Sequence, residues 1–68
     1  MAFSIERNIR AKRVKRGFTQ LEMAHKLGLS VSGYNHKENG KRHFTLEEFF
    51  LICEILRANP DSLISKSI

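Results

Sequence analysis

A run of polar residues, 30–39, carries the side chains of this chain that are best suited to chemistry. Val31 and Tyr34 are its large apolar members. A helix over this run would bury little of its surface, so the remainder must be presented to a partner. Hydroxyl and amide groups can hydrogen-bond to the edges of nucleobases, and asparagine can pair with adenine through two hydrogen bonds. The polar members of the run include Ser32, Asn35, His36, Lys37 and Asn39.

The rest of the chain offers no comparable arrangement for catalysis or metal binding. The three histidines are spaced 11 and 7 residues apart, which matches no zinc pattern, and Cys53 is the one cysteine. We expect Cys53 to be a small core residue. Glu47 and Glu48 are adjacent and would project in different directions from a helix, so they form no carboxylate pair. The sequence also lacks a glycine-rich phosphate loop. We therefore expect no enzyme activity, metal, cofactor or small-molecule ligand.

Charge is distributed unevenly along the chain. Lysine and arginine number 12 against 7 acidic residues, giving a net charge of +5. Residues 1–44 hold ten basic and three acidic residues, whereas residues 45–68 are net acidic. A basic end of this kind favours a polyanionic partner, most often nucleic acid, although a purely solubilising surface is the alternative.

Length and hydropathy set the class of protein. Sixty-eight residues make one small domain, and 41% hydrophobic residues suffice for a core. The longest apolar run, residues 49–53, is far shorter than the roughly 20 residues that span a bilayer. The first residues reach charge at once and contain no secretory apolar segment. We expect a cytoplasmic, nucleoid-associated protein without a membrane partner.

Glycines and capping residues divide the chain into helical runs. Gly17, Gly28 and Gly40 each follow about ten residues and suit the left-handed position just past a helix end. Residues 19–22 and 45–48 both match the capping box, with threonine first and glutamate three residues later. No segment alternates with period two, so no strand is predicted. The predicted helices lie between Ser4 and Gly17, and at residues 19–27, 30–39, 45–56 and 60 to about 64, with Ser4 and Ser30 as caps and Pro60 in the first turn of the last helix.

The second and third runs form a helix-turn-helix pattern. Two short helices are separated by Gly28 and Leu29, a spacing typical of this motif. Leu29 can fill the corner between them, and Ala24 is small where the two helices should approach closely.

These residues resemble the Cro/C1-type helix-turn-helix family, also called the Xre family, which includes phage repressors. The similarity extends from residue 5 to about residue 64 and includes residues 9–13 (Ile-Arg-Ala-Lys-Arg), 17–20 (Gly-Phe-Thr-Gln), 23–30 and 38–41. The resemblance implies an all-α, five-helix, lambda-repressor-like domain over residues 1–68, with the helix-turn-helix at about 19–39. It also implies a regulator that binds double-stranded DNA sequence-specifically as a homodimer on a two-fold operator, most often as a repressor.

The resemblance assigns roles to individual residues. Base contacts fall to the third helix, at Val31, Ser32, Asn35 and His36, with Val31 beside a thymine methyl group. His36 is equally placed for a phosphate. Gln20 corresponds to the family's phosphate-binding and orienting glutamine. Backbone contacts fall to Gln20, Arg13, Lys37, Asn39, Lys41 and Arg42. Arg13 and Glu38 resemble a family pair that links the first helix to the third, which can also be purely structural.

Three positions depart from the family pattern. Gly33 lies inside the third helix, where it either permits close approach to DNA or makes the helix malleable. Lys37 replaces an apolar residue, so its stem could cover the core while its ammonium reaches a phosphate. Arg57 replaces the common glycine after the fourth helix, which puts the following turn in doubt.

The fourth helix is apolar on almost every side, which is hard to bury in one copy of so short a chain. Six of its apolar residues can pack inward, namely Leu46, Phe49, Phe50, Ile52, Cys53 and Leu56. This leaves Leu51 and Ile55 off the main apolar stripe, and Ile64 and Ile68 can extend the surface that these two form. We predict a homodimer interface here, and the alternative is a tight monomeric core. The predicted interface residues are Leu51, Ile55, Ala58 and Ile64.

A different function is also open: an antitoxin-like interaction module with the apolar fourth helix as its partner surface.

Overall fold

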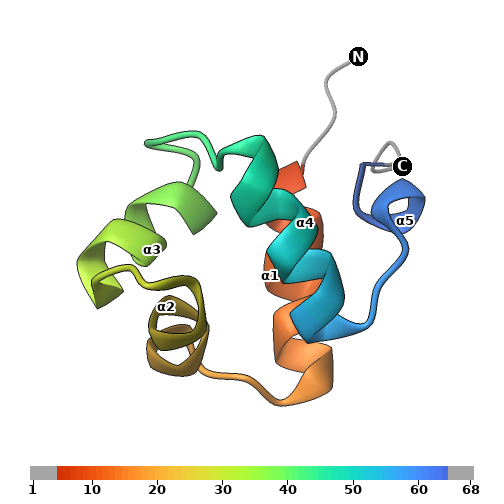
Figure 1. The fold of residues 1–68 in the computed structure, drawn as a ribbon, viewed down its shortest axis with the longest axis horizontal. Helices are drawn as coiled ribbons and strands as arrows, with labels where there is room; N and C mark the ends of the chain where they lie inside the picture. Colours follow the sequence, from red (N-terminus) through yellow and green to blue (C-terminus); the bar gives the residue numbers. More distant parts are fainter. Residues whose placement is uncertain (1–4, 65–68) are drawn as a thin grey trace.

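The computed structural model describes residues 5–64, which form five helices and no strand (Figure 1). This confirms the predicted all-α, five-helix architecture. The helices are α1 (Ile5–Arg16), α2 (Gln20–Leu27), α3 (Val31–Glu38), α4 (Leu46–Leu56) and α5 (Pro60–Ile64). The cap predicted at Ser4 and the surface position predicted at Ile68 lie outside the described residues.

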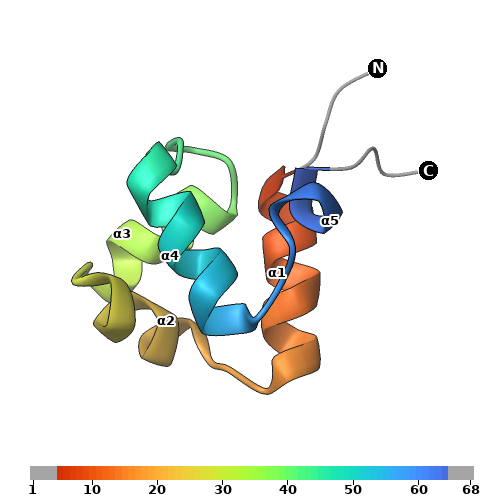
Figure 2. The ribbon, with the colours of Figure 1, turned by 45° about the vertical axis from the view of Figure 1, so that its right-hand side comes forward.

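The helices pack around one core. α2 and α3 lie together at one side of the molecule, α5 lies at the opposite side, and α1 and α4 stand between them (Figures 1 and 2). α1 contacts α3, α4 and α5, and α4 also packs on α2. Each of the five helices contributes to the buried apolar cluster. Its members are Ile9, Met23, Ala24, Tyr34, Ile52, Cys53, Leu56 and Leu63, which confirms the core positions predicted for Ala24 and Cys53.

Local capping fixes the helix boundaries. The Thr19 hydroxyl accepts the backbone N–H of Glu22 at 3.0 Å, and the Glu22 carboxylate accepts the N–H of Thr19 at 2.8 Å. The same reciprocal pair closes the start of α4 between Thr45 and Glu48. The glycine that ends α2, Gly28, takes the left-handed conformation with φ 70°. Both capping boxes and this helix end therefore form as the sequence predicts.

Arg57 keeps the turn between α4 and α5 although it replaces a glycine. It adopts the left-handed conformation, with φ 52° and ψ 50°, and its backbone N–H donates to carbonyls in the last turn of α4. Arg16 covers the same helix end, because its Nε donates to the Leu56 carbonyl at 2.8 Å and its Nη2 to the Arg57 carbonyl at 3.2 Å. A cation at a helix C-terminus is favoured by the helix dipole.

Val14 of α1 is exposed, and so are Leu46 and Phe50 of α4, which were predicted to face inward. Val14 is 61% exposed, because it lies about 140° around α1 from the buried Ile9. Leu46 and Phe50 are also exposed, since they share a side of α4 that borders an open hollow rather than the core. α5 is held by its buried Leu63 and by a hydrogen bond in which Asn8 Nδ2 donates to the Leu63 carbonyl at 2.7 Å.

Residues 5–64 contain no helix that is both long and apolar enough to cross a bilayer. The same range contains no group of three or more histidine, cysteine or acidic side chains that could hold a metal ion.

Candidate nucleic-acid interface

One face of α3 is left open by the rest of the chain. Val31, Ser32 and His36 are exposed, and Asn35 beside them is partly buried. The opposite face carries Tyr34, which is fully buried in the core. α3 lies at the edge of the molecule beside α2 and far from α5, as Figures 1 and 2 both show. The four residues predicted to contact bases are therefore brought together on the unburied side of this helix.

The N-terminus of α3 is capped by Ser30, whose hydroxyl accepts the backbone N–H of Gly33 at 3.0 Å. A Cβ on Gly33 would stand 2.9 Å from that hydroxyl oxygen. The same cap forms at Glu22 and Glu48, which carry a Cβ, so a small shift of the Ser30 hydroxyl would accommodate a side chain here. The two interpretations of Gly33 drawn from the sequence therefore stay predictions.

The buried face of α3 is anchored by a carboxylate. Glu38 is only 2% exposed, and Arg13 of α1 donates to it from Nε at 2.8 Å and from Nη2 at 3.1 Å. The Tyr34 hydroxyl donates at 2.6 Å and Gln20 Nε2 at 2.9 Å. The predicted link from Arg13 to Glu38 is therefore confirmed, and the hydrogen bonds from Arg13 and Gln20 hold α3 against α1 and α2.

The electrostatics of this cluster favour an ionised Glu38. Burial alone would raise the pKa of the Glu38 carboxyl, but the hydrogen bonds from its three donors outweigh burial and hold the pKa below its ordinary value. Burial, together with the hydrogen bond to Glu38, raises the pKa of Tyr34. The carboxylate therefore acts as an acceptor at neutral pH, and the phenol acts as a donor.

Two cations predicted to contact phosphates are engaged inside the protein. The Arg13 side chain is only 11% exposed, and its Nη1 also donates to the Phe18 carbonyl at 2.7 Å. Lys37 Nζ lies 2.6 Å and 2.8 Å from the carboxylate oxygens of Glu48. The Lys37 ammonium therefore points to α4, because the capping box places a carboxylate there. Both side chains are thus held by protein partners, and a contact of either with a phosphate stays a prediction.

Other polar and basic side chains gather at the C-terminal end of α3. Lys41 and Arg42 are exposed, and their backbone N–H groups both donate to the His36 carbonyl, at 2.8 Å and 3.3 Å. Asn39 is the exposed C-cap of α3, and Arg10 Nη2 donates to its Oδ1 at 2.6 Å. The sequence analysis missed Arg10. It precedes Arg13 by three residues on α1, so a shared face was the available signal.

Gln20 joins the N-terminus of α2 to α3. Its Oε1 accepts a hydrogen bond from Asn35 Nδ2 at 3.1 Å, while its Nε2 donates to Glu38. The Asn35 Oδ1 in turn accepts from Asn39 Nδ2 at 3.1 Å. Gln20, Asn35 and Asn39, all predicted to contact DNA, are thus linked to one another.

A family model described as Helix-turn-helix matches residues 9–63, which include the whole arrangement described above. The chain belongs to this helix-turn-helix family. The match and the fold confirm the resemblance to Cro/C1-type proteins and identify a DNA-binding regulator of transcription. No curated protein matches the sequence significantly.

A solved structure shares the fold of this helix-turn-helix protein. It is the restriction-modification controller protein C.AhdI from Aeromonas hydrophila, which superimposes with a TM-score of 0.78 at 25% sequence identity. The match covers 88% of this chain and 91% of that chain. The likeness therefore extends over nearly the whole length of both proteins.

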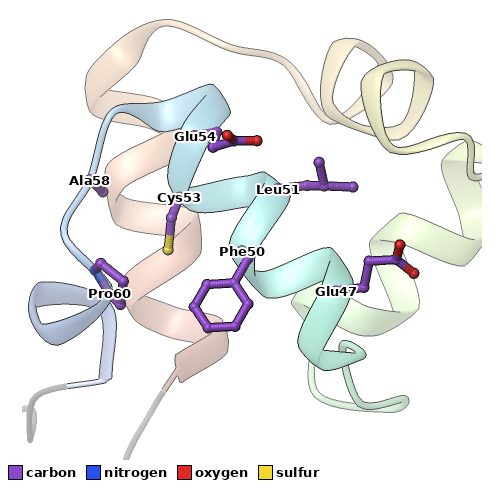
Figure 3. Close-up of a pocket in the computed structure, with 7 residues that line it drawn as sticks. All are labelled: Glu47, Phe50, Leu51, Cys53, Glu54, Ala58 and Pro60. Atoms are coloured by element: carbon purple, nitrogen blue, oxygen red, sulfur yellow. The ribbon is translucent and has the colours of Figure 1, made fainter.

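A second open surface of this helix-turn-helix protein lies on α4. Figure 3 shows Phe50 and Cys53 pointing toward α5, while Leu51 points to another side of α4. These residues line a hollow of about 510 Å³ with glutamates 47 and 54 at its edge. A second hollow of about 520 Å³ adjoins it, with Phe50 and Pro60 shared between the two.

The predicted interface residues divide between this surface and the core. Leu51 is 40% exposed and Ile64 is 39% exposed, so both are available to a partner. Ile55 and Ala58 pack against the core instead. The turn at Arg57 brings Ala58 back onto the molecule, and its N–H donates to the Cys53 carbonyl at 2.9 Å.

Proposed function

We propose that this protein is a sequence-specific transcriptional repressor that inserts α3 into the major groove of DNA. The observation that carries the proposal is the open face of α3, where Val31, Ser32, Asn35 and His36 lie on a helix held rigidly from behind by Glu38. A recognition helix needs such a face, since base edges are read by side chains that water can reach before binding.

Phosphate contacts are proposed at both ends of this face. Gln20 begins α2, where backbone N–H groups favour an anion. Asn39, Lys41 and Arg42 follow α3 directly, and Arg10 lies beside Asn39. Contacts of this kind fix the register of the protein on the duplex, while the base contacts supply sequence preference.

We further propose that the repressor acts as a homodimer on a two-fold operator, in the cytoplasm at the nucleoid. On α4, Glu47, Leu51 and Glu54 point to one exposed side and Phe50 is exposed on the adjoining side. Ile64 of α5 is also exposed and lines the same hollow as Phe50. Exposed apolar residues grouped on one helix favour a protein contact. A two-fold dimer would present two recognition helices about 34 Å apart, one turn of DNA.

Selection from a random duplex library tests this function directly. The purified chain should enrich a short two-fold motif with half-sites separated by one helical turn. The Asp61→Ala variant, altered at an exposed residue of α5 away from α3 and outside the proposed interface, should select the same motif. Enrichment of a single half-site would contradict the dimer, and enrichment of no motif would contradict sequence-specific binding.

A protein-interaction module is the second candidate, and the two adjoining apolar hollows beside α4 favour it. In that case the exposed α4 face would bind a different protein, and DNA would be incidental. The same selection separates the two candidates, because an interaction module would enrich no two-fold motif.

A further inference from the structure

Three side-chain amides connect Arg10 to Glu38 in an unbroken line of hydrogen bonds. Arg10 Nη2 donates to Asn39 at 2.6 Å, Asn39 Nδ2 donates to Asn35 at 3.1 Å, and Asn35 Nδ2 donates to Gln20 at 3.1 Å. Gln20 Nε2 completes the line by donating to the Glu38 carboxylate at 2.9 Å. Arg10 Nε lies 3.7 Å from the same Glu38 oxygen, so the line closes on itself. We call Gln20, Asn35 and Asn39 the amide relay.

The two ends of the amide relay determine its direction. A guanidinium group can only donate hydrogen bonds, and an ionised carboxylate can only accept them. Arg10 therefore requires an oxygen from Asn39, and Glu38 requires an N–H from Gln20. Reversing any one amide would bring two donors or two acceptors face to face, which forfeits hydrogen bonds in a partly buried site. All three amides consequently point the same way.

The direction of the relay decides what Asn35 can offer to DNA. An asparagine side chain has two N–H donors and two acceptor lone pairs. The relay uses one donor toward Gln20 and one lone pair toward Asn39. One N–H and one lone pair are left, which is the combination that pairs with the N7 and N6 positions of adenine.

We propose that Asn39 and Arg10 are positioning residues that, with Gln20, hold the Asn35 amide in the orientation that reads one base. The proposal rests on the proposed function, because it assumes that the open face of α3 meets base edges. It assigns Asn39 and Arg10 a part in sequence discrimination and not only in phosphate binding. An amide held before binding loses less conformational freedom when it meets its base.

A double-mutant cycle tests the proposal on the full chain and its selected duplex. The first step identifies the base pair of the duplex at which Asn35→Ala loses sequence preference. Discrimination at that base pair is the Kd for a duplex with the base pair changed, divided by the Kd for the selected duplex. Asn39→Ala should lower this ratio about tenfold, within the range that one bidentate contact supplies. In the Asn35→Ala background, Asn39→Ala should leave the ratio unchanged, since there is no amide left to position.

A change of polarity at Asn39 separates positioning from simple contact. Asn39→Asp retains an acceptor for Arg10 but cannot donate to Asn35, so it should lower the discrimination ratio as much as Asn39→Ala does. Arg10→Ala should lower the ratio to a smaller extent. Arg7→Ala is the matched control, because Arg7 is an exposed arginine one turn earlier on α1. It should leave the ratio at the wild-type value.

The possible results distinguish a failure of this proposal from a failure of the proposed function on which it rests. If Asn39→Ala and Asn39→Asp weaken binding to every duplex equally, Asn39 is a phosphate contact and the proposal is overturned while the function stands. A ratio lowered equally with and without Asn35 overturns it as well. If the wild-type chain selects no motif, the proposed function and this proposal both fall.

A measurement without DNA keeps the test independent of affinity. The Asn35 side-chain NH₂ should give an ordered nitrogen-15 relaxation signature in the wild type and a mobile one in Asn39→Ala. Asn39 is exposed, so this variant spares the buried cluster around Glu38. Unchanged order in Asn39→Ala would overturn the proposal.

Discussion

Lys37 Nζ lies 2.6 Å and 2.8 Å from the two carboxylate oxygens of Glu48, and this contact ties α3 to the first turn of α4. The same carboxylate accepts the backbone N–H of Thr45 at 2.9 Å. Glu48 thus caps α4 and holds α3 at once. This ion pair therefore connects α3, the proposed recognition helix, to α4, which carries the proposed dimer surface.

Glu48→Ala should lower the free energy of unfolding by about 2 kcal/mol, because it removes part of the capping box and leaves the half-buried Lys37 ammonium unpaired. Urea denaturation measures the change. Glu47→Ala is the matched control, since Glu47 is an exposed glutamate in the same turn, and it should change stability by less than about 0.5 kcal/mol. Equal losses in both variants would contradict the assigned role of Glu48.

Acid should destabilise the protein through Glu38 and Glu48. Burial would raise the pKa of each carboxyl, but hydrogen bonds lower both below the ordinary value. A lowered pKa means that stabilisation is complete above the pKa of the unfolded chain, about 4.3. It is then lost as the pH falls toward the lower folded pKa, because the unfolded chain takes up protons first.

Thermal melting between about pH 6 and pH 3 checks this sign, with Tm expected to fall below about pH 4.3. Glu38→Gln should melt lower than the wild type at neutral pH and lose less Tm on acidification, since one of the carboxyl groups with a lowered pKa is gone. A wild-type Tm that stays level or rises in acid would refute the account of this buried cluster.

Arg57→Gly should stabilise the protein by about 0.5–1 kcal/mol, because Arg57 occupies the left-handed region that glycine adopts without penalty. Gly28→Ala should destabilise it by about 1 kcal/mol for the same reason. A Cβ at Gly28 would meet nothing within 4 Å, so the cost is conformational alone. Chemical denaturation of both variants decides the matter, and a loss of stability in Arg57→Gly would show that the arginine side chain itself supports the turn.

The sequence predicts the helices well because their ends are fixed locally. The capping boxes at Thr19 and Thr45 and the left-handed Gly28 depend on residues only three or four positions away. The amide relay could not be predicted from the sequence, since Asn39 and Arg10 are 29 residues apart and meet only when α1 packs on α3.

The sequence could not predict which way a side chain faces where the apolar periodicity of its helix was ambiguous. α4 is apolar on almost every side, so periodicity could not separate the exposed Leu46 from the packed Ile55. Lys37 was predicted to reach a phosphate because its stem lies beside the core. Its partner Glu48 belongs to a different helix, and only the turn between α3 and α4 brings the two side chains together.

Leu51→Lys should shift the proposed dimer toward monomer and weaken self-association at least tenfold, because it places a charge on the exposed apolar side of α4. Sedimentation equilibrium over a range of protein concentrations measures this effect. Leu21→Lys is the control, since Leu21 is 63% exposed on α2 and lies outside the proposed interface. If Leu51→Lys associates as the wild type does, the dimer surface lies elsewhere.

In the proposed function, the open face of α3 reads bases while neighbouring basic residues hold the phosphates. Salt titration of Asn35→Ala and Arg42→Ala, on the selected duplex and on a scrambled one, tests it most directly. Asn35→Ala should cost about 1–3 kcal/mol on the selected duplex alone, with the salt slope unchanged. Arg42→Ala should weaken binding to both duplexes and reduce the slope by about one. If the two variants respond alike to sequence and to salt, α3 does not read DNA in this way.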